Sequence, residues 1–385
     1  MNAETTSMLS NTRLRKKSTR NDSRHRAWAS LLPELLIQIL MKLGIIELLA
    51  CAGVCKEWRS VTKDHRSTLL QNQKPLALVV SKFAKRGCFL HNLFDGTRYK
   101  TLLPNFSSRW LMGFSCGYLI MQSHRNITLK HLITRHEIIF PEVPVLKRHI
   151  SKAILFYSEK VSENLLIAVN KLYWQVYVSL TSRPEWHWIA LIGCRNELVD
   201  MAYFDGNILV LNKDAGIGEL KLQYQSLNTD GTTLKARQRV KFFNVRINYP
   251  AEWELSPFCL VPTSDQLFMV SHVGQTISPP MLVHRLDRAR KEWIQVNDLG
   301  EDALFISEGS CALVKPAKWG GRSNCIYVLS KLSNELSMYL LNTDNRFWHS
   351  SVIQEEGSNL QPHFWYFPHQ IDDQNKVHCL EEVMN

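Results

Sequence analysis

Apolar residues recur at helical spacing near the N-terminus of the chain. Four of them stand at i, i+3, i+4 and i+7, the spacing of one helix face: Leu36, Ile39, Leu40 and Leu43. Pro33 suits the first helical position because its φ is fixed, and the carboxylate of Glu34 is favourable at the positive end of the helix dipole. Gly44 follows at a place where helices commonly end. The pattern predicts three short helices, over residues 33–43, 47–52 and 54–61.

A different pattern begins after Pro75. Helical spacing gives way to short apolar runs that are rich in strand-forming residues and bounded by turn residues. The clearest runs predict strands at Leu76–Val80, Tyr118–Gln122, Leu165–Val169, Tyr173–Leu180, Ile208–Leu211, Phe268–Val273, Leu282–Leu286, Ile326–Leu329 and Met338–Leu341. We therefore predict a mainly β protein, with a helical module over residues 27–70 and a β region over residues 71–385.

The β region is repetitive. A turn followed by an apolar strand occurs five times, and the third residues of these units are Tyr118, Leu165, Asn207, Gln266 and Cys325. Their mean separation is (325 − 118)/4, or about 52 residues. Three of the units continue with a strand, a polar turn and a tryptophan, at Trp186, Trp293 and Trp348. A fourth copy of this continuation falls near residues 240–242.

A period near fifty residues with several short strands is typical of a kelch-like β-propeller blade. The region is long enough for about six such blades. The aromatic run from His363 to Phe367 is interpreted as the segment that closes the ring, in preference to a ligand cage. Two packed β-sandwiches are the alternative, but they would not produce this recurrence.

Positive charge is concentrated at the N-terminus. The whole chain has a formal net charge of +11, and residues 1–26 hold seven basic against two acidic residues, or 7 − 2 = +5. This segment has few large apolar groups, so we predict a disordered tail. Its basic run is a candidate nuclear localisation signal, formed by Arg13, Arg15, Lys16 and Lys17. The β region has no basic stripe interleaved with aromatics, which does not favour nucleic-acid binding.

Motifs that carry chemistry are missing from the sequence. It contains no Gly-rich phosphate loop and no His-Glu-x-x-His. The nine cysteines are scattered without a Cys-x-x-Cys pair, which predicts free thiols in a reducing compartment. Cys51 and Cys55 are interpreted as packing residues. We expect no metal site, no cofactor, no catalytic residue, no secretory signal and no membrane span.

The helical module resembles the F-box. The match is carried by Leu-Pro-Glu-Leu at residues 32–35 and by Val-Cys-Lys-x-Trp-Arg at residues 54–59, with leucines and isoleucines between them. The resemblance implies three helices that dock on a Skp-family adaptor. The residues it assigns to adaptor binding are Leu32, Pro33, Leu35, Leu36, Ile39, Leu40, Leu43, Leu48, Leu49, Val54, Cys55 and Trp58.

The β region is similar to the propeller domain of unknown function that follows the F-box in a large group of plant proteins. The marks of this resemblance are Gly113–Leu119, the Asp205-Gly206 turn, Val283–Asp287 and the final Trp365–Pro368, with Leu299–Ile306 as the most specific. Together with the F-box, the resemblance covers about residues 28–370.

These resemblances imply a binding protein and not an enzyme. We expect the substrate-recognition subunit of an SCF-type cullin–RING ubiquitin ligase, acting in the nucleus, the cytoplasm or both. Its helices would bind the adaptor, and through it cullin, and its propeller would hold a target protein that the sequence does not identify. The alternatives are a propeller enzyme or lectin-like binder, and a nuclear nucleic-acid-binding protein that uses the basic tail.

Overall fold

The computed structural model describes two compact units, Met1–Arg66 and Ser67–Asn385. The described residues are 28, 31–81, 87–102, 110–123, 126–132, 136–141, 143, 150–158, 162–170, 175–182, 185–190, 197–220, 222–227, 231–236, 241–243, 245–247, 255–273, 281–330, 335–341, 347–351 and 360–368. The predicted tail over residues 1–26, with its candidate nuclear signal, lies outside them. None of the seven described cysteines forms a disulfide bond.

The N-terminal unit is helical, as predicted, with helices α2 (Pro33–Leu40), α3 (Ile45–Ala52) and α4 (Lys56–Asp64). Helix α2 ends earlier than the periodicity predicts, because the N–H groups of Lys42 and Leu43 bond three residues back and tighten the last turn. Helix α4 begins later than predicted, because Cys55 is its N-cap. A further helix at the boundary of the two units, α5 (Arg66–Gln71), was not predicted.

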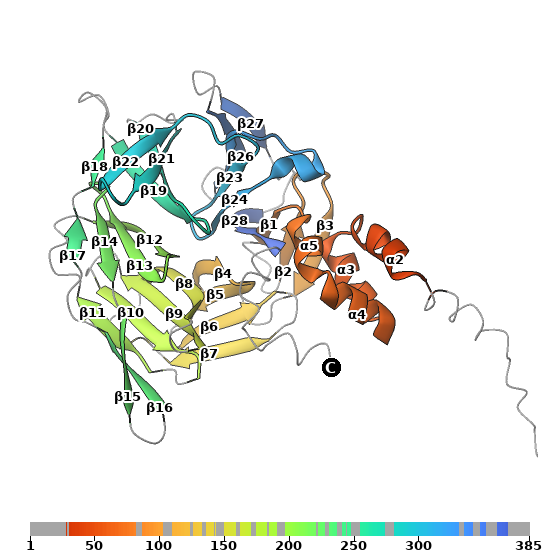
Figure 1. The fold of residues 1–385 in the computed structure, drawn as a ribbon, viewed down its shortest axis with the longest axis horizontal. Helices are drawn as coiled ribbons and strands as arrows, with labels where there is room; N and C mark the ends of the chain where they lie inside the picture. The colour runs from red at the N-terminus through yellow and green to blue at the C-terminus, as the bar shows by residue number, and fades with distance from the viewer. Residues whose placement is uncertain are drawn as a thin grey trace, which may run out of the picture. The chain divides into compact units, whose positions relative to one another are not determined.

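The second unit is a six-bladed β-propeller, which confirms the predicted fold (Figure 1). Each predicted strand coincides with an observed strand to within a few residues at its ends. From the first strand named to the last in each sheet, blade 1 contains β28 (Leu360–Tyr366), β1 (Leu76–Ser81), β2 (Gly87–His91) and β3 (Arg98–Leu102); blade 2 contains β4 (Trp110–Ser115), β5 (Tyr118–Gln122), β6 (Asn126–His131) and β7 (Glu137–Pro141); blade 3 contains β8 (Ile150–Ser158), β9 (Glu163–Asn170), β10 (Gln175–Leu180) and β11 (His187–Ala190).

The other three blades are larger or carry additions. Blade 4 contains β12 (Leu198–Phe204), β13 (Asn207–Asn212), β14 (Ile217–Leu220) and β17 (Lys241–Phe243), and between the last two the chain forms a separate hairpin of β15 (Leu222–Leu227) and β16 (Gly231–Ala236); blade 5 contains β19 (Leu255–Pro262), β20 (Leu267–Val273), β21 (Met281–Asp287), β22 (Glu292–Val296) and β18 (Arg246–Ile247); blade 6 contains β24 (Cys311–Val314), β23 (Ala303–Ile306), β25 (Cys325–Ser330), β26 (Glu335–Leu340) and β27 (Phe347–Ser351).

The ring closes through blade 1, which takes strands from both ends of the unit. Strand β28 pairs antiparallel with β1, with Ala77 opposite Trp365 and Leu78 opposite Phe364. The Trp365 side chain is fully buried, and its indole N–H donates to the carbonyl of Ile306 in blade 6 at 3.1 Å. The aromatic run near the C-terminus therefore closes the ring, as the sequence predicts.

The repeats seen in the sequence correspond to fixed places in the blades. The repeated turns join the first strand of a blade to the second in blades 2 to 5. Two of them, at Cys116-Gly117 and Asp205-Gly206, have positive φ at both central residues, as tight hairpins require. Trp186 and Trp293 lie beside or in the fourth strand of their blades, and Trp348 lies in the fifth strand of blade 6, β27. Trp186 and Trp293 each donate an indole hydrogen bond to a carbonyl of the preceding blade, at 2.9 and 2.8 Å.

The core lies between facing sheets of adjacent blades. Val176 of β10 and Val210 of β13 share one apolar cluster, and Val270 of β20 and Leu304 of β23 share another. Gly113 on β4 marks a close approach between blades 2 and 3, because a Cβ there would lie 2.2 Å from the carbonyl oxygen of Ala153 on β8.

A buried ion pair joins three blades at their first strands. Lys152 on β8 pairs with Asp200 on β12, and the same carboxylate accepts the backbone N–H groups of Met201 and Leu260 at 2.8 Å each. Leu260 belongs to β19. Burial opposes the charged lysine, but the Asp200 carboxylate outweighs it and raises the pKa of Lys152. Lys152 therefore stays charged, and the pair links blades 3, 4 and 5.

We expect His284 to make the stability of the propeller depend on pH. It is 1% exposed on β21, neither ring nitrogen has a hydrogen-bond partner among the described residues, and burial lowers its pKa to about 4. In the unfolded chain the imidazole of His284 binds a proton with a pKa near 6.5, whereas in the folded chain it binds one only near pH 4. The free energy of unfolding therefore falls as the pH drops from about 6.5 to 4. We expect a loss of about 3 kcal/mol over this window.

Urea unfolding followed by circular dichroism at several pH values measures this loss. The variant His284→Leu should remove that part of the pH dependence. An unchanged slope in the variant would contradict the assignment to His284.

A candidate partner-binding surface

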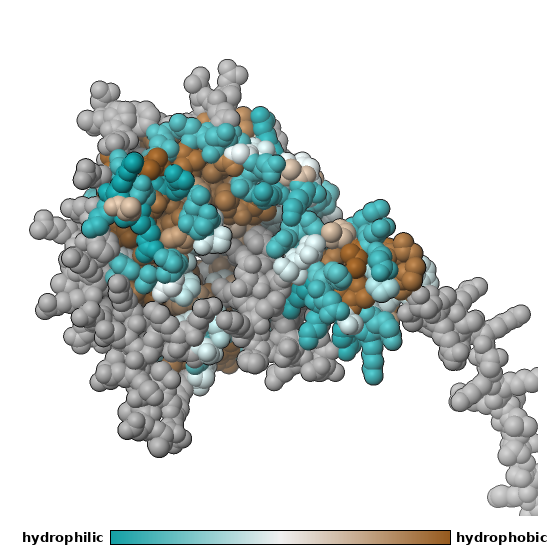
Figure 2. Space-filling model, in the orientation of Figure 1, coloured by the Kyte–Doolittle hydropathy of each residue, from teal (hydrophilic) through white to brown (hydrophobic). Residues whose placement is uncertain are grey.

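Large apolar side chains that reach solvent gather on the helical unit (Figure 2). Those of this kind in the helical unit are Trp28, Leu32, Leu35, Ile39, Met41, Ile46 and Val54. Among the described residues of the propeller, only Trp110 and Ile139 are of this kind. We call the seven residues of the helical unit the apolar surface. Contiguous exposed apolar groups of this sort normally mark an interaction site.

Helix α2 and the residue before it explain how this surface arises. Leu35 and Ile39 are four positions apart and share an outward face, while Leu36 and Leu40 share the inward face. Leu35 is 47% exposed, whereas Leu36 is 1% exposed. A helix that is apolar on both faces is normally buried on both. Since the described helices cover only the inward face, the outward one is available to another protein.

The twelve predicted adaptor-binding residues fall into three groups in the structure. Those exposed are Leu32, Pro33, Leu35, Ile39 and Val54; those half-buried are Leu43, Leu49, Cys55 and Trp58; those buried are Leu36, Leu40 and Leu48. The three buried leucines are at most 3% exposed, so in this conformation they are not part of the surface that faces solvent.

Three hydrogen bonds hold the second half of the F-box-like pattern in place. The Cys55 thiol accepts the backbone N–H of Trp58 at 3.5 Å and caps α4. The Trp58 indole donates to the carbonyl of Trp28 at 3.1 Å, and Arg59 donates from Nε to the carbonyl of Ala52 at 3.2 Å. The pattern Val-Cys-Lys-x-Trp-Arg thus fixes the turn that presents Val54 to solvent.

Sequence reasoning missed three residues of the apolar surface: Trp28, Met41 and Ile46. Met41 and Ile46 flank Gly44 and belong neither to the helical spacing nor to the F-box-like pattern that selected the others. Trp28 precedes the recognisable pattern by four residues. An isolated apolar residue next to a predicted helix gives no signal of exposure, so only the structure identifies them.

The surface carries little reactive chemistry. Burial, aided by the nearby Glu47 carboxylate, raises the pKa of the Cys51 thiol, which makes it a weaker nucleophile. Across the described part of the chain, no group of His, Cys, Asp and Glu side chains is arranged to hold a metal ion. None of the described helices combines the length and apolarity that crossing a bilayer requires.

The family of the chain is decided by its β region. Residues 89–354 match the KIB1-4 β-propeller family. The chain belongs to that family. Residues 28–68 match the F-box-like domain, so this KIB1-4 family member carries an F-box-like domain before its propeller. A comparison with curated proteins found no match.

The solved structures compared with this KIB1-4 family member have low sequence identity and low TM-scores. The N-terminal domain of Nup159 is 11% identical, with 75% of each chain covered and a TM-score of 0.33. The Cps50 (Swd1) β-propeller domain of Myceliophteria thermophila is 12% identical, with 70% of this chain and 78% of that one covered and a TM-score of 0.34. A catalytically inactive virginiamycin B lyase from Staphylococcus aureus with quinupristin is 9% identical, with 74% and 91% covered and a TM-score of 0.33. Nothing about function follows from these likenesses.

The two faces of α2 predict opposite responses to substitution. Leu36→Ala removes a buried side chain and should lower the free energy of opening of the helical unit by about 2–5 kcal/mol. Leu35→Ala removes an exposed one and should change it by less than about 0.5 kcal/mol. Hydrogen exchange of the amides in α2 to α4, measured by mass spectrometry on the full chain, reports both. Equal loss of protection in the two variants would contradict the assignment of faces.

Proposed function

We propose that this chain is the substrate-recognition subunit of an SCF-type cullin–RING ubiquitin ligase. The observation that carries the proposal is the apolar surface, which lies on a domain matching the F-box-like family. F-box domains generally bind Skp-family adaptors. The adaptor would cover the outward face of α2 and the exposed Val54, and would join the chain to cullin.

In this proposal the chain acts by proximity and not as an enzyme. The propeller holds a target protein while the adaptor places the complex beside a ubiquitin-loaded conjugating enzyme. Holding the target there raises its effective concentration near the activated carbonyl. The chain forms no thioester and contributes no catalytic residue.

Co-purification with a Skp-family adaptor tests the proposal. The full chain should retain the adaptor, and the double variant Leu35→Asp with Val54→Asp should lose it by at least about tenfold in affinity, because two charges would be buried at the interface. Both residues are exposed, so the variant should fold, which circular dichroism checks. Ile139→Asp is the matched control, since Ile139 is an exposed apolar residue of blade 2.

Two outcomes would count against the receptor role. One is a folded full chain that retains no adaptor. The other is equal retention by the double variant and by the control, because the apolar surface would then not be the binding site.

We also propose that the basic run of the N-terminal segment directs the chain to the nucleus. Its residues are Arg13, Arg15, Lys16 and Lys17. In a fluorescent fusion of the full chain, replacing all four by glutamine should reduce the nuclear fraction severalfold. The control replaces Arg20, Arg24 and Arg26, which lowers the charge of the same segment but leaves the run intact. If the nuclear fraction fell in both variants in proportion to the positive charge removed, the result would contradict a specific signal.

A further inference from the structure

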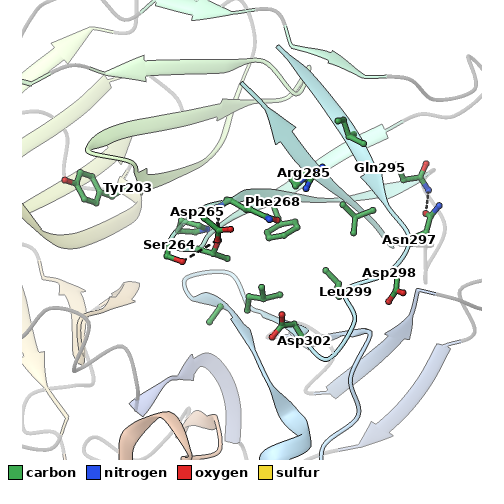
Figure 3. A pocket seen from close by; sticks show the side chains of 17 residues that line it. Tyr203, Ser264, Asp265, Phe268, Arg285, Gln295, Asn297, Asp298, Leu299 and Asp302 are labelled. Carbon is green, nitrogen blue, oxygen red and sulfur yellow. Dashed lines mark hydrogen bonds between the residues drawn. The ribbon is translucent and has the colours of Figure 1, made fainter. Parts of the chain in front are cut away.

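A large cavity of the propeller lies against blade 5, where the chain passes to blade 6 (Figure 3). Its volume is about 1150 Å³. One wall is the turn between β19 and β20, at residues 262–266, and another is the loop over residues 297–302 that leads into β23. This loop begins the Leu299–Ile306 segment, the most specific mark of the propeller in the sequence. The proposed adaptor binding makes no use of it.

The cavity is lined by charged side chains. Asp265 stands on the first wall, Asp298 and Asp302 stand on the second, and Arg285 of β21 also lines the cavity (Figure 3). Three carboxylates against one guanidinium give a local charge of 1 − 3 = −2, in a chain whose net charge is +11. The cavity therefore attracts cations although the chain as a whole repels them.

Hydrogen bonds stabilise the conformation of both acidic walls. Thr263 and Gln266 bond each other through backbone N–H and carbonyl at 2.8 Å, and the Thr263 hydroxyl bonds the Asp265 carboxylate at 3.1 Å. On the other wall, the backbone carbonyl of Asp302 accepts the N–H of Asn324 at 2.7 Å, and the Asn324 side chain accepts the N–H of Leu299 at 2.9 Å. A ligand would then lose little affinity to ordering of these walls.

The arrangement of the carboxylates distinguishes between cationic ligands. Among the described residues, no three acidic, histidine or cysteine side chains are gathered closely enough to hold a metal ion. The carboxylates therefore suit several positive charges spaced apart. The cavity also exceeds the 300–1,000 Å³ typical of small-molecule sites. Both observations favour an extended chain with more than one basic side chain.

We propose that this cavity receives a segment of the target protein that carries two or more lysine or arginine side chains. The basic side chains pair with Asp265, Asp298 and Asp302, and Arg285 donates to a main-chain carbonyl of the same segment. The inference rests on the proposed role of the propeller as the target-binding part of the chain, and it names the chemistry of the target.

The state of Asp302 agrees with a cationic ligand. Burial raises the pKa of its carboxyl above the ordinary value, even though Lys315 acts in the opposite direction. No described residue makes a hydrogen bond to this carboxylate. The negative charge of the ionised Asp302 carboxylate therefore receives no hydrogen bond from a described residue, and an incoming ammonium or guanidinium group would stabilise it.

Fluorescence anisotropy with the full chain tests the proposal. The probe is a labelled nine-residue peptide of alternating lysine and serine, and the same peptide with glutamate in place of lysine is the reference. The lysine peptide should bind saturably and the glutamate peptide should not. Asp302→Asn and Asp265→Asn should each weaken binding about fivefold, and added salt should weaken it further.

The matched control is Glu301→Gln. Glu301 precedes Asp302 in the chain and carries the same charge, but it does not line the cavity and pairs with Lys315 at 3.3 Å on the surface. Its replacement should change the affinity by less than about twofold. The three variants alter exposed or half-buried carboxylates, so their folding should be unchanged.

Three results would overturn the proposal: no saturable binding of the lysine peptide, equal binding of both peptides, or the same loss in Glu301→Gln as in Asp302→Asn. The assay contains no adaptor, so it is independent of the receptor role. A chain that retains the adaptor but not the peptide contradicts the cavity assignment alone. A chain that binds the peptide but not the adaptor contradicts the receptor role alone.

Discussion

The propeller depends on the pairing of its last strand with its first. Blade 1 takes β28 from the C-terminal end of the unit and β1, β2 and β3 from its N-terminal end. The blade therefore forms only when the two ends of the unit meet. An unpaired β1 would leave an open edge, which is a site of misassociation. Trp365 makes the closure cooperative, because its ring is buried in the cluster between blades 6 and 1 and its N–H is satisfied by Ile306. Closing blade 1 therefore also fixes blade 6.

The Lys152–Asp200 pair provides a second constraint, placed on the opposite part of the ring. A buried ion pair adds little net stability, but losing one partner leaves an uncompensated charge. Here the carboxylate also accepts two backbone N–H groups, one of them from β19. Any shift of blade 3, 4 or 5 along its neighbours would break one of these bonds. The pair thus specifies the register of three blades, whereas the apolar clusters between blades would tolerate small slips.

The sequence predicted most of the propeller and less of the binding surface, for physical reasons. The second strands of blades 2 to 5 follow tight turns such as Asp205-Gly206, whose residues have a strong conformational preference, so they could be located. Blade 6 could not be worked out in the same way. There β23 pairs parallel with β25, with β24 and a 3₁₀ turn (Pro316–Trp319) between them, and such a crossover has no local signal. Periodicity found α2, but it placed Ile39 on the same face as Leu36 and Leu40, whereas the structure exposes Ile39 beside Leu35.

The two units expose surfaces of different physical character, and this difference bears on how one chain could bind two partners. The apolar surface of the helical unit is suited to a permanent complex. Burying it removes the free-energy cost of exposing apolar side chains to water, which the free chain always bears. The cavity of the propeller is charged and lies on a rigid frame, and association steered by charge is fast and weakened by salt. A partner bound through such a cavity can exchange while the apolar contact persists. The proposed receptor role, in which the chain stays in its assembly while successive targets come and go, fits this combination of surfaces.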